Sequence, residues 1–155
     1  MLNKIIQKIF TKFTTFKANP FHPLVWINGN PKIGKNVVIS GFSEINANHA
    51  NVTIGDNCDI ASFVAINAAD SHMKCLGLSN EIDRRDITIG NNVFMGVSSS
   101  VKNRKNIGDN VTVGQGAVVT KNIPPNKTYV GNPAIDIDGY KAWEKAKTQL
   151  LKNNY

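Results

Sequence analysis

His72 is the residue of this chain best suited to move a proton. An imidazole titrates near neutral pH, so His72 can take a proton from an attacking hydroxyl or amine. Two acidic residues, Asp70 and Glu81, can each orient the ring and stabilise its charged form. The other histidines are weaker candidates, because His22 lies in a proline-rich capping loop and His49 in an asparagine-rich bulge. These residue types predict general base catalysis.

A hydrophobic repeat predicts the elements that must position His72. Thirteen aliphatic or methionine residues keep a spacing of six within three blocks, and we call them the anchors: Ile27, Ile33, Ile39, Ile45, Ile54, Ile60, Ile66, Ile89, Met95, Val101, Ile107, Val113 and Val119. A period of six fits neither a helix nor a simple alternation. It is typical of a solenoid with three flat faces and eighteen residues per coil, here about four coils.

The residue two before each anchor is expected to share the inward face, because side chains alternate along a strand. Most of these positions are small or aliphatic: Val37, Ser43, Val52, Cys58, Val64, Val93, Ser99, Val111 and Ala117. Lys105 does not fit, and it predicts a bulge or a face covered by a neighbouring subunit. Four anchors are followed by Gly90, Gly96, Gly108 and Gly114. We expect these glycines to supply a positive φ at the corners.

These repeats resemble the hexapeptide-repeat acyltransferases. The motifs that carry the resemblance are Ile54-Gly55-Asp56-Asn57, Ile89-Gly90-Asn91-Asn92, Ile107-Gly108-Asp109-Asn110, the closing segment Val119-Thr120-Lys121-Asn122-Ile123-Pro124-Pro125, and Val130-Gly131-Asn132-Pro133-Ala134. The resemblance covers about residues 27–135 and implies a mainly β fold, a left-handed parallel β-helix. It also implies use of acetyl-CoA and a homotrimer with active sites between subunits.

A break in the repeat provides the place for His72. Ile66 and Ile89 are 23 residues apart, which we interpret as one coil plus five extra residues, with an excursion loop over about 71–86. The family's catalytic histidine commonly starts such a loop, which implies that role for His72. His72 also falls six residues after Ile66, so a buried anchor is the alternative. Burial without partners costs about 1 to 3 kcal/mol, and we favour catalysis.

Further site residues follow from this count and from the family. If the excursion is one coil plus five residues, Met95 is the neighbour of His72 in the next coil. The Gly96 N–H is then the expected oxyanion donor. The pantetheine arm of coenzyme A is expected along the backbone near Gly96, Gly114 and Gly116. Thr120 and Lys121 match the family's Thr-Lys step, which lies near coenzyme A. The step at Asn103-Arg104-Lys105 departs from the family, so either Arg104 reaches a phosphate there or the segment simply forms a different corner.

The acceptor is expected to meet two further groups of polar residues. Asn46 and Asn48 lie in the bulge between the first two blocks and can face a sugar. In the excursion, Glu81 with Asp83 can hold an ammonium group, and Arg84 with Arg85 can hold a diphosphate. All of these are equally well read as ordinary loop residues in water.

The predicted function is transfer of an acetyl group from acetyl-CoA to an amine or hydroxyl of a sugar. We favour a nucleotide-linked amino sugar, for surface glycan or polysaccharide biosynthesis. The alternatives are O-acetylation of a polysaccharide or other small hydroxylated acceptor, and a non-catalytic β-helix scaffold. A carbonic anhydrase of this fold needs three zinc-binding histidines, two of them close in sequence, and the spacings of 27 and 23 argue against it. We expect no metal.

Composition agrees with this prediction. The 155 residues allow one domain, and a net charge of +7 suits coenzyme A or a nucleotide sugar, although lysines also simply solvate a surface. Dispersed lysines and few aromatic residues argue against nucleic acid. The two cysteines, Cys58 and Cys75, form neither a metal motif nor a disulfide framework. We therefore expect a cytoplasmic protein.

The two ends differ from the β-helix domain at 27–135. Within the segment 1–26, residues 2–17 have the pattern of an amphipathic helix that is too polar to span a bilayer. We expect this helix to cover the open end of the solenoid, and the alternative is contact with the inner face of an anionic membrane. Within 136–155, a short helix from Asp138 to about Leu151 is expected to serve packing or trimer contacts.

Overall fold

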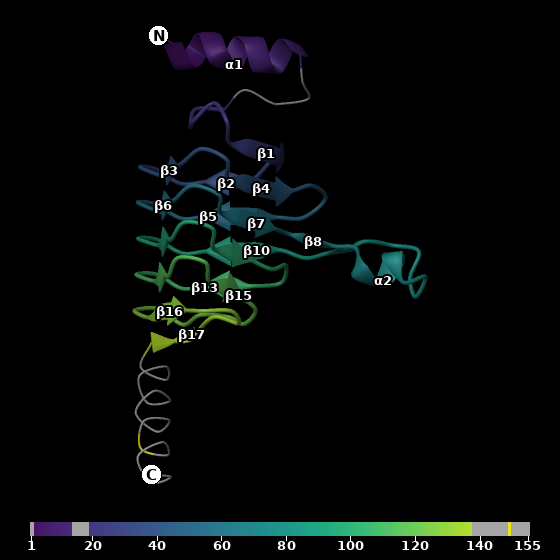
Figure 1. The fold of residues 1–155 in the computed structure, drawn as a ribbon, viewed down its shortest axis with the longest axis vertical. Coiled ribbons are helices and arrows are strands. Elements are labelled where there is room, and N and C mark those ends of the chain that lie inside the picture. Colours follow the sequence, from purple (N-terminus) through teal and green to yellow (C-terminus); the bar gives the residue numbers. More distant parts are fainter. Residues whose placement is uncertain (1, 14–18, 138–148, 150–155) are drawn as a thin grey trace.

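The computed structural model describes residues 2–13, 19–137 and 149. The chain winds into a stack of coils, with the helix α1 (Leu2–Phe13) beyond the first coil and a hairpin projecting from one side (Figure 1). Three parallel sheets form the faces of the stack, and in each sheet the strands come from successive coils. This is the predicted parallel β-helix, with four full coils and part of a fifth.

We name the three sheets A, B and C. Sheet A contains β1 (Trp26–Gly29), β4 (Glu44–Ala47), β7 (Ala65–Asn67), β12 (Ser100–Val101) and β15 (Val118–Val119). Sheet B contains β2 (Lys32–Ile33), β5 (Val52–Ile54), β10 (Ile87–Ile89) and β13 (Asn106–Ile107). Sheet C contains β3 (Val38–Ile39), β6 (Asp59–Ile60), β11 (Phe94–Met95), β14 (Thr112–Val113), β16 (Thr128–Val130) and the antiparallel β17 (Ile135–Asp136).

The anchors form the core, as predicted. Each pairs with the anchor one coil away, for example Ile45 with Ile66 and Met95 with Val113. Eleven of the thirteen are buried, and only Ile27 and Ile33 in the first coil are half-buried. The predicted positions two before the anchors are also buried, except Val37, which is half-buried in the same coil. The open end of the stack explains all three exceptions.

Asparagines supply the positive φ at the corners from sheet B to sheet C, and Phe42, Phe63, Ser98 and Gly116 supply it at the corners from sheet C to sheet A. None of Gly90, Gly96, Gly108 and Gly114 has a positive φ, so that expectation is wrong. The residues that turn the corner from sheet B to sheet C, with φ between 54° and 60°, are Asn36, Asn57, Asn92, Asn110 and Asn126. Their side chains bond to one another from coil to coil, as in Asn92 Nδ2 to Asn110 Oδ1 at 2.9 Å. Asparagine tolerates this conformation better than most residues.

The glycines are needed because the coils are close together. A Cβ on Gly108 would lie 2.6 Å from the backbone nitrogen of Pro125, and a Cβ on Gly96 would lie 2.6 Å from that of Gln115. These distances are too short for any side chain. Space between adjacent coils therefore selects glycine at these positions.

The excursion is longer than the count of five extra residues. Ile54 pairs with Ile89, its neighbour one coil away, although the two are 35 residues apart. One coil takes eighteen, so seventeen residues are inserted within a single step from sheet A to sheet B. The inserted residues include β8 (Ala69–Asp70), α2 (His72–Cys75) and β9 (Asp83–Arg84), and β8 pairs antiparallel with β9. The chain leaves the stack and returns without completing an extra coil.

The ends are described in part. The helix α1 lies within the segment 2–17 that was predicted to be helical, and its side chains Ile5, Ile9 and Phe13 are 50, 53 and 76% exposed. These side chains therefore do not cover the first coil. The helix predicted from Asp138 to about Leu151 lies outside the described residues, apart from position 149. None of the helices within the described ranges is long and apolar enough to cross a membrane.

Candidate functional site

The irregular steps of the coil all fall on one edge of the prism. Every step between inward-facing positions from sheet B to C and from C to A is six residues long, whereas the steps from A to B vary from four to 23. We call the line of A-to-B corners the site edge. A regular solenoid can form without insertions. Insertions that gather on one edge therefore point to that edge as the location of a functional site.

A hairpin on the site edge positions the catalytic candidate. β8 and β9 pair through Asp70 with Asp83 and Ala69 with Arg84, and α2 lies at the outer end (Figure 1). The hairpin is tied to the next coil by Asn103, whose Nδ2 donates to the backbone oxygen of Asp83 at 3.4 Å and to its Oδ2 at 3.3 Å. Asn103 is only 5% exposed. The base of the hairpin is therefore fixed to the stack.

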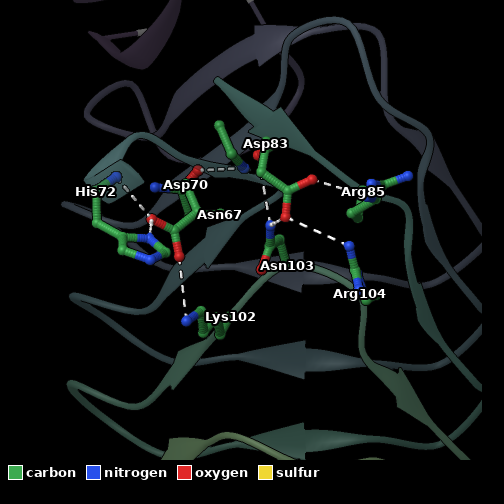
Figure 2. Close-up of polar contacts among 9 residues, drawn as sticks. Asn67, Asp70, His72, Asp83, Arg85, Lys102, Asn103 and Arg104 are labelled. Carbon is green, nitrogen blue, oxygen red and sulfur yellow. Dashed lines mark hydrogen bonds and ion pairs between the residues drawn. The ribbon is translucent and has the colours of Figure 1, made fainter. Parts of the chain in front are cut away.

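His72 and Asp70 form an acid–base pair at the start of α2 (Figure 2). The Nδ1 of His72 lies 2.6 Å from Oδ1 of Asp70, and the backbone N–H of His72 donates to the same oxygen at 3.1 Å. The Nζ of Lys102 lies 3.1 Å from Oδ2 of Asp70. Because Nδ1 is engaged, Nε2 is the ring nitrogen left to exchange a proton with a substrate.

The environment of Asp70 keeps it charged. The hydrogen bond from the His72 ring, then that from the His72 backbone and the contact with Lys102, hold the pKa of Asp70 well below its usual range. The Asp70 side chain is 18% exposed, and that of His72 is 59% exposed. A fixed carboxylate with an accessible imidazole is the arrangement that general base catalysis requires. The exposed ring also excludes the buried-anchor alternative for His72.

All three arginines of the chain gather beside this pair. Arg85 Nε lies 2.7 Å from Oδ1 of Asp83, and Arg104 Nη2 lies 3.5 Å from Oδ2 of the same carboxylate (Figure 2). Arg84 Nε donates to the backbone oxygen of Asn48 at 3.1 Å. A hollow of about 470 Å³ is lined by these arginines together with His72 and other hairpin residues. The wall of the hollow thus contains an imidazole, three guanidinium groups and the carboxylates of Glu81 and Asp83.

Several predicted site residues lie along the site edge, at different coils. Glu81 lines the same hollow as His72, but the residue bonded to the imidazole is Asp70. Asn46 and Asn48 lie one coil away, where Asn46 Nδ2 donates to Asn67 Oδ1 at 3.2 Å. Thr120 and Lys121 lie at the last A-to-B corner, directly after β15.

The predicted glycines lie elsewhere. Gly96, Gly114 and Gly116 all lie on the edge between sheets C and A. Met95 stacks between Ile60 and Val113, so it does not neighbour His72. The Gly96 N–H donates to the Val113 carbonyl at 2.8 Å and is not available as the predicted oxyanion donor. The error follows from counting an extra coil in the excursion.

Sequence reasoning missed the residues that support the pair. Lys102 and Asn103 follow β12, whose Val101 pairs with Ile66 just before the hairpin. This register places both residues next to the base of the excursion. Pairing Ile66 with Val101 as neighbouring anchors would have found them. Asn103, not Lys105, is the buried residue at this corner, where Arg104 has a φ of 68°.

Other features of the described residues lack this chemistry. A hollow of about 630 Å³ at the first coil is lined by His22 and apolar residues such as Phe21 and Val38, without a carboxylate. No group of three or more histidine, cysteine, aspartate or glutamate side chains within the described ranges is arranged to hold a metal.

The comparisons with known proteins agree with the fold and the repeat. No family model matches the chain. The galactoside O-acetyltransferase of Escherichia coli (strain K12) is 37% identical over 105 residues, which cover 67% of this chain and 51% of that protein. A solved galactoside acetyltransferase in complex with coenzyme A is 34% identical, with a TM-score of 0.67, over 77% of this chain and 60% of that chain.

A maltose O-acetyltransferase from Clostridium difficile 630 is 26% identical, with a TM-score of 0.57, over 86% of this chain and 83% of that chain. The chain spans about half the length of the curated galactoside relative. The predicted resemblance to the hexapeptide-repeat sugar acyltransferases, with their left-handed β-helix, is confirmed.

Proposed function

We propose that this hexapeptide-repeat protein is an acetyltransferase that moves an acetyl group from acetyl-CoA to a sugar, with His72 as general base. The observation that carries the proposal is the His72–Asp70 pair, fixed by Lys102 on the one edge where the repeat is interrupted. The likeness to galactoside and maltose acetyltransferases supports the reaction class. A non-catalytic scaffold would not require this hydrogen-bonded pair of His72 and Asp70.

The reaction needs one proton to move twice. Nε2 of His72 takes the proton of the acceptor hydroxyl or amine while its oxygen or nitrogen bonds to the carbonyl carbon of the thioester. The carbon–sulfur bond then breaks, and the coenzyme A sulfur takes the proton from the imidazolium. Asp70 holds the ring through Nδ1 and stabilises its positive charge between the two steps. No covalent acyl-enzyme is required.

The arginines favour an acceptor that carries negative charge. Only three of the eighteen basic residues of the chain are arginines, and all three lie beside His72. A guanidinium group binds phosphate oxygens through two parallel hydrogen bonds, which an ammonium group does not. A nucleotide-linked sugar presents a diphosphate that matches this cluster. We therefore keep the nucleotide-linked amino sugar as the proposed acceptor, with a neutral glycoside as the alternative that the galactoside relative suggests.

We further propose a cytoplasmic homotrimer, in which the site is shared between copies. Thr120 and Lys121 lie on the site edge, whereas Gly114 and Gly116 lie on the edge between sheets C and A. One chain holds these two groups on separate edges. A coenzyme A molecule that contacts both must therefore lie between two copies, as the family resemblance implies.

Two measurements test the function. Acetyl-CoA should raise the thermal unfolding temperature of the wild-type protein, and no shift would support the scaffold alternative. An acetyl-transfer screen should then compare nucleotide diphosphate sugars with neutral galactosides. For a nucleotide sugar, the variant Arg85→Gln/Arg104→Gln should raise KM by about tenfold or more. The variant Lys74→Gln removes a nearby charge outside the hollow and serves as the control. Equal KM in all three proteins would refute the anionic acceptor.

A further inference from the structure

The positive charge of the chain is concentrated at its N-terminal end. The first 43 residues contain six lysines and no aspartate or glutamate, and the first acidic residue is Glu44. The remaining 112 residues contain twelve basic and eleven acidic residues. Nearly all of the net charge of +7 therefore belongs to α1, the linking segment and the first coil. Such a field attracts an anionic partner to this end of the molecule.

α1 presents an apolar stripe next to a basic stripe. Ile5, Ile9 and Phe13 recur every four residues, so they lie on one face of the helix, and each is at least half exposed. Lys4, Lys8 and Lys12 have the same spacing, one residue earlier, and all three are exposed. None of the α1 side chains whose burial is described belongs to the buried core. The stripe is thus available to a partner outside this chain.

The position of α1 suits a flat surface. The helix lies across the axis of the stack, beyond the first coil and at the opposite end from β17 (Figure 1). Lys32 and Lys35 in the first coil are also exposed. A flat surface laid along the exposed stripe of α1 meets apolar side chains next to the row of Lys4, Lys8 and Lys12.

We propose that α1 binds the surface of an anionic lipid bilayer. The apolar stripe enters the boundary between headgroups and acyl chains, and the lysines meet the lipid phosphates. A lipid surface fits better than a second protein because the apolar residues and the lysines run as two parallel stripes along the whole described helix. This inference does not depend on the enzymatic activity.

The orientation has a consequence for the site. β7, which leads into the hairpin, is the third strand of sheet A counted from α1. Strands in a sheet are about 4.8 Å apart, so the hairpin lies only about 10 Å beyond the first coil. Binding through α1 therefore places the hairpin at the third coil counted from the membrane.

Sedimentation with vesicles tests the proposal on the full chain. The wild type should bind vesicles of phosphatidylcholine with about one-third phosphatidylglycerol, should not bind pure phosphatidylcholine, and should be released by salt. Ile5→Glu/Ile9→Glu should abolish binding. Lys4→Gln/Lys8→Gln/Lys12→Gln should weaken it about a hundredfold, at about fivefold per lysine. The control Lys74→Gln/Lys105→Gln/Lys121→Gln removes the same charge elsewhere and should bind within a few-fold of wild type.

Three outcomes would overturn the proposal: no binding by the wild type, equal loss in the two lysine variants, or unchanged binding by Ile5→Glu/Ile9→Glu. A change of molecular mass in the Ile5→Glu/Ile9→Glu variant, without vesicle binding by the wild type, would instead assign the stripe to contacts between copies. Circular dichroism melting checks that each variant keeps the folded β-helix. Acetyl transfer to a soluble acceptor should be unchanged in the Ile5→Glu/Ile9→Glu variant, because the stripe is distant from the hairpin.

Discussion

Replacing Asp70 with asparagine removes the charge beside the proposed base while keeping the shape of the side chain. In the wild type, this carboxylate faces His72 Nδ1 at 2.6 Å and Lys102 Nζ at 3.1 Å. An amide oxygen turned towards His72 leaves the amide NH₂ facing the Lys102 ammonium. An NH₂ group turned towards His72 forces the proton onto Nε2, the wrong tautomer for a base. Either orientation leaves the imidazolium without its counter-charge.

The expected loss follows from the strength of this contact. A hydrogen bond to a charged group contributes about 1.5 to 3 kcal/mol, which corresponds to about 10- to 150-fold in rate. The His72 side chain is 59% exposed, so water screens the interaction and the lower part of this range applies, about 10- to 30-fold in kcat. Initial rates of coenzyme A release should show this fall with KM for acetyl-CoA unchanged. Lys102→Met, which removes only the contact at Oδ2, should lose less. A kcat for Asp70→Asn within twofold of wild type would refute the reasoning.

The same variant predicts a dependence of stability on pH. Because the pKa of Asp70 is lowered in the folded protein, the unfolded chain binds the proton more readily. The contribution of Asp70 to the free energy of unfolding is therefore complete above the unfolded pKa, near 4, and is lost as pH falls through the lowered folded value. Urea unfolding of wild type and Asp70→Asn should show a difference at pH 6 that shrinks at pH 3. A difference that grows on acidification would contradict this sign.

Three further predictions concern the coil. Ser43→Ala should lower the free energy of unfolding by about 1 kcal/mol, because the Ser43 hydroxyl donates to the Ala61 carbonyl at 2.8 Å. Ser99→Ala should be neutral or stabilising, because the buried Ser99 hydroxyl has no protein partner. Equal effects of the two substitutions in urea unfolding would contradict this. Gly108→Ala should cost about 1 to 3 kcal/mol in the same assay, because its Cβ meets the next coil, and a neutral result would refute close packing as the reason for glycine. Native thiol titration should label Cys75 and spare Cys58, whose pKa is raised by burial, until denaturant is added; rapid labelling of both would contradict the buried position.

The repeat made most of the fold predictable. A spacing of six residues predicted the core, because each anchor must face the axis in every coil, and the pairing of Ile27 with Ile45, eighteen residues apart, follows from that spacing alone. Small residues such as Ser43 and Ala117 were expected inside for the same reason and are buried there. The role of the glycines was mistaken, because the sequence does not show how closely successive coils approach.

The site was less predictable because it depends on where the insertion falls. His72 and Asp70 were predicted as site residues from their residue types and their place at the start of the break, and the structure brings their side chains together. A break of 23 residues has two solutions, a coil plus five or a single step with seventeen inserted, and only strand pairing distinguishes them. The interpretation as one coil plus five residues was wrong. It placed Gly96 beside His72 and did not predict that Lys102 lies next to Asp70. Contacts between coils, which no local pattern encodes, decided these positions.

The central claim is that His72 is the base of acetyl transfer, and one rate comparison tests it most directly. His72→Ala and the matched control His49→Asn should be measured with wild type, at saturating acetyl-CoA and acceptor. His49 has a φ of 56°, which asparagine tolerates, and it lies outside the hairpin. We predict that His72→Ala loses about 10²- to 10⁴-fold in kcat while His49→Asn keeps the wild-type rate. A His72→Ala enzyme that turns over at the full rate would contradict the account.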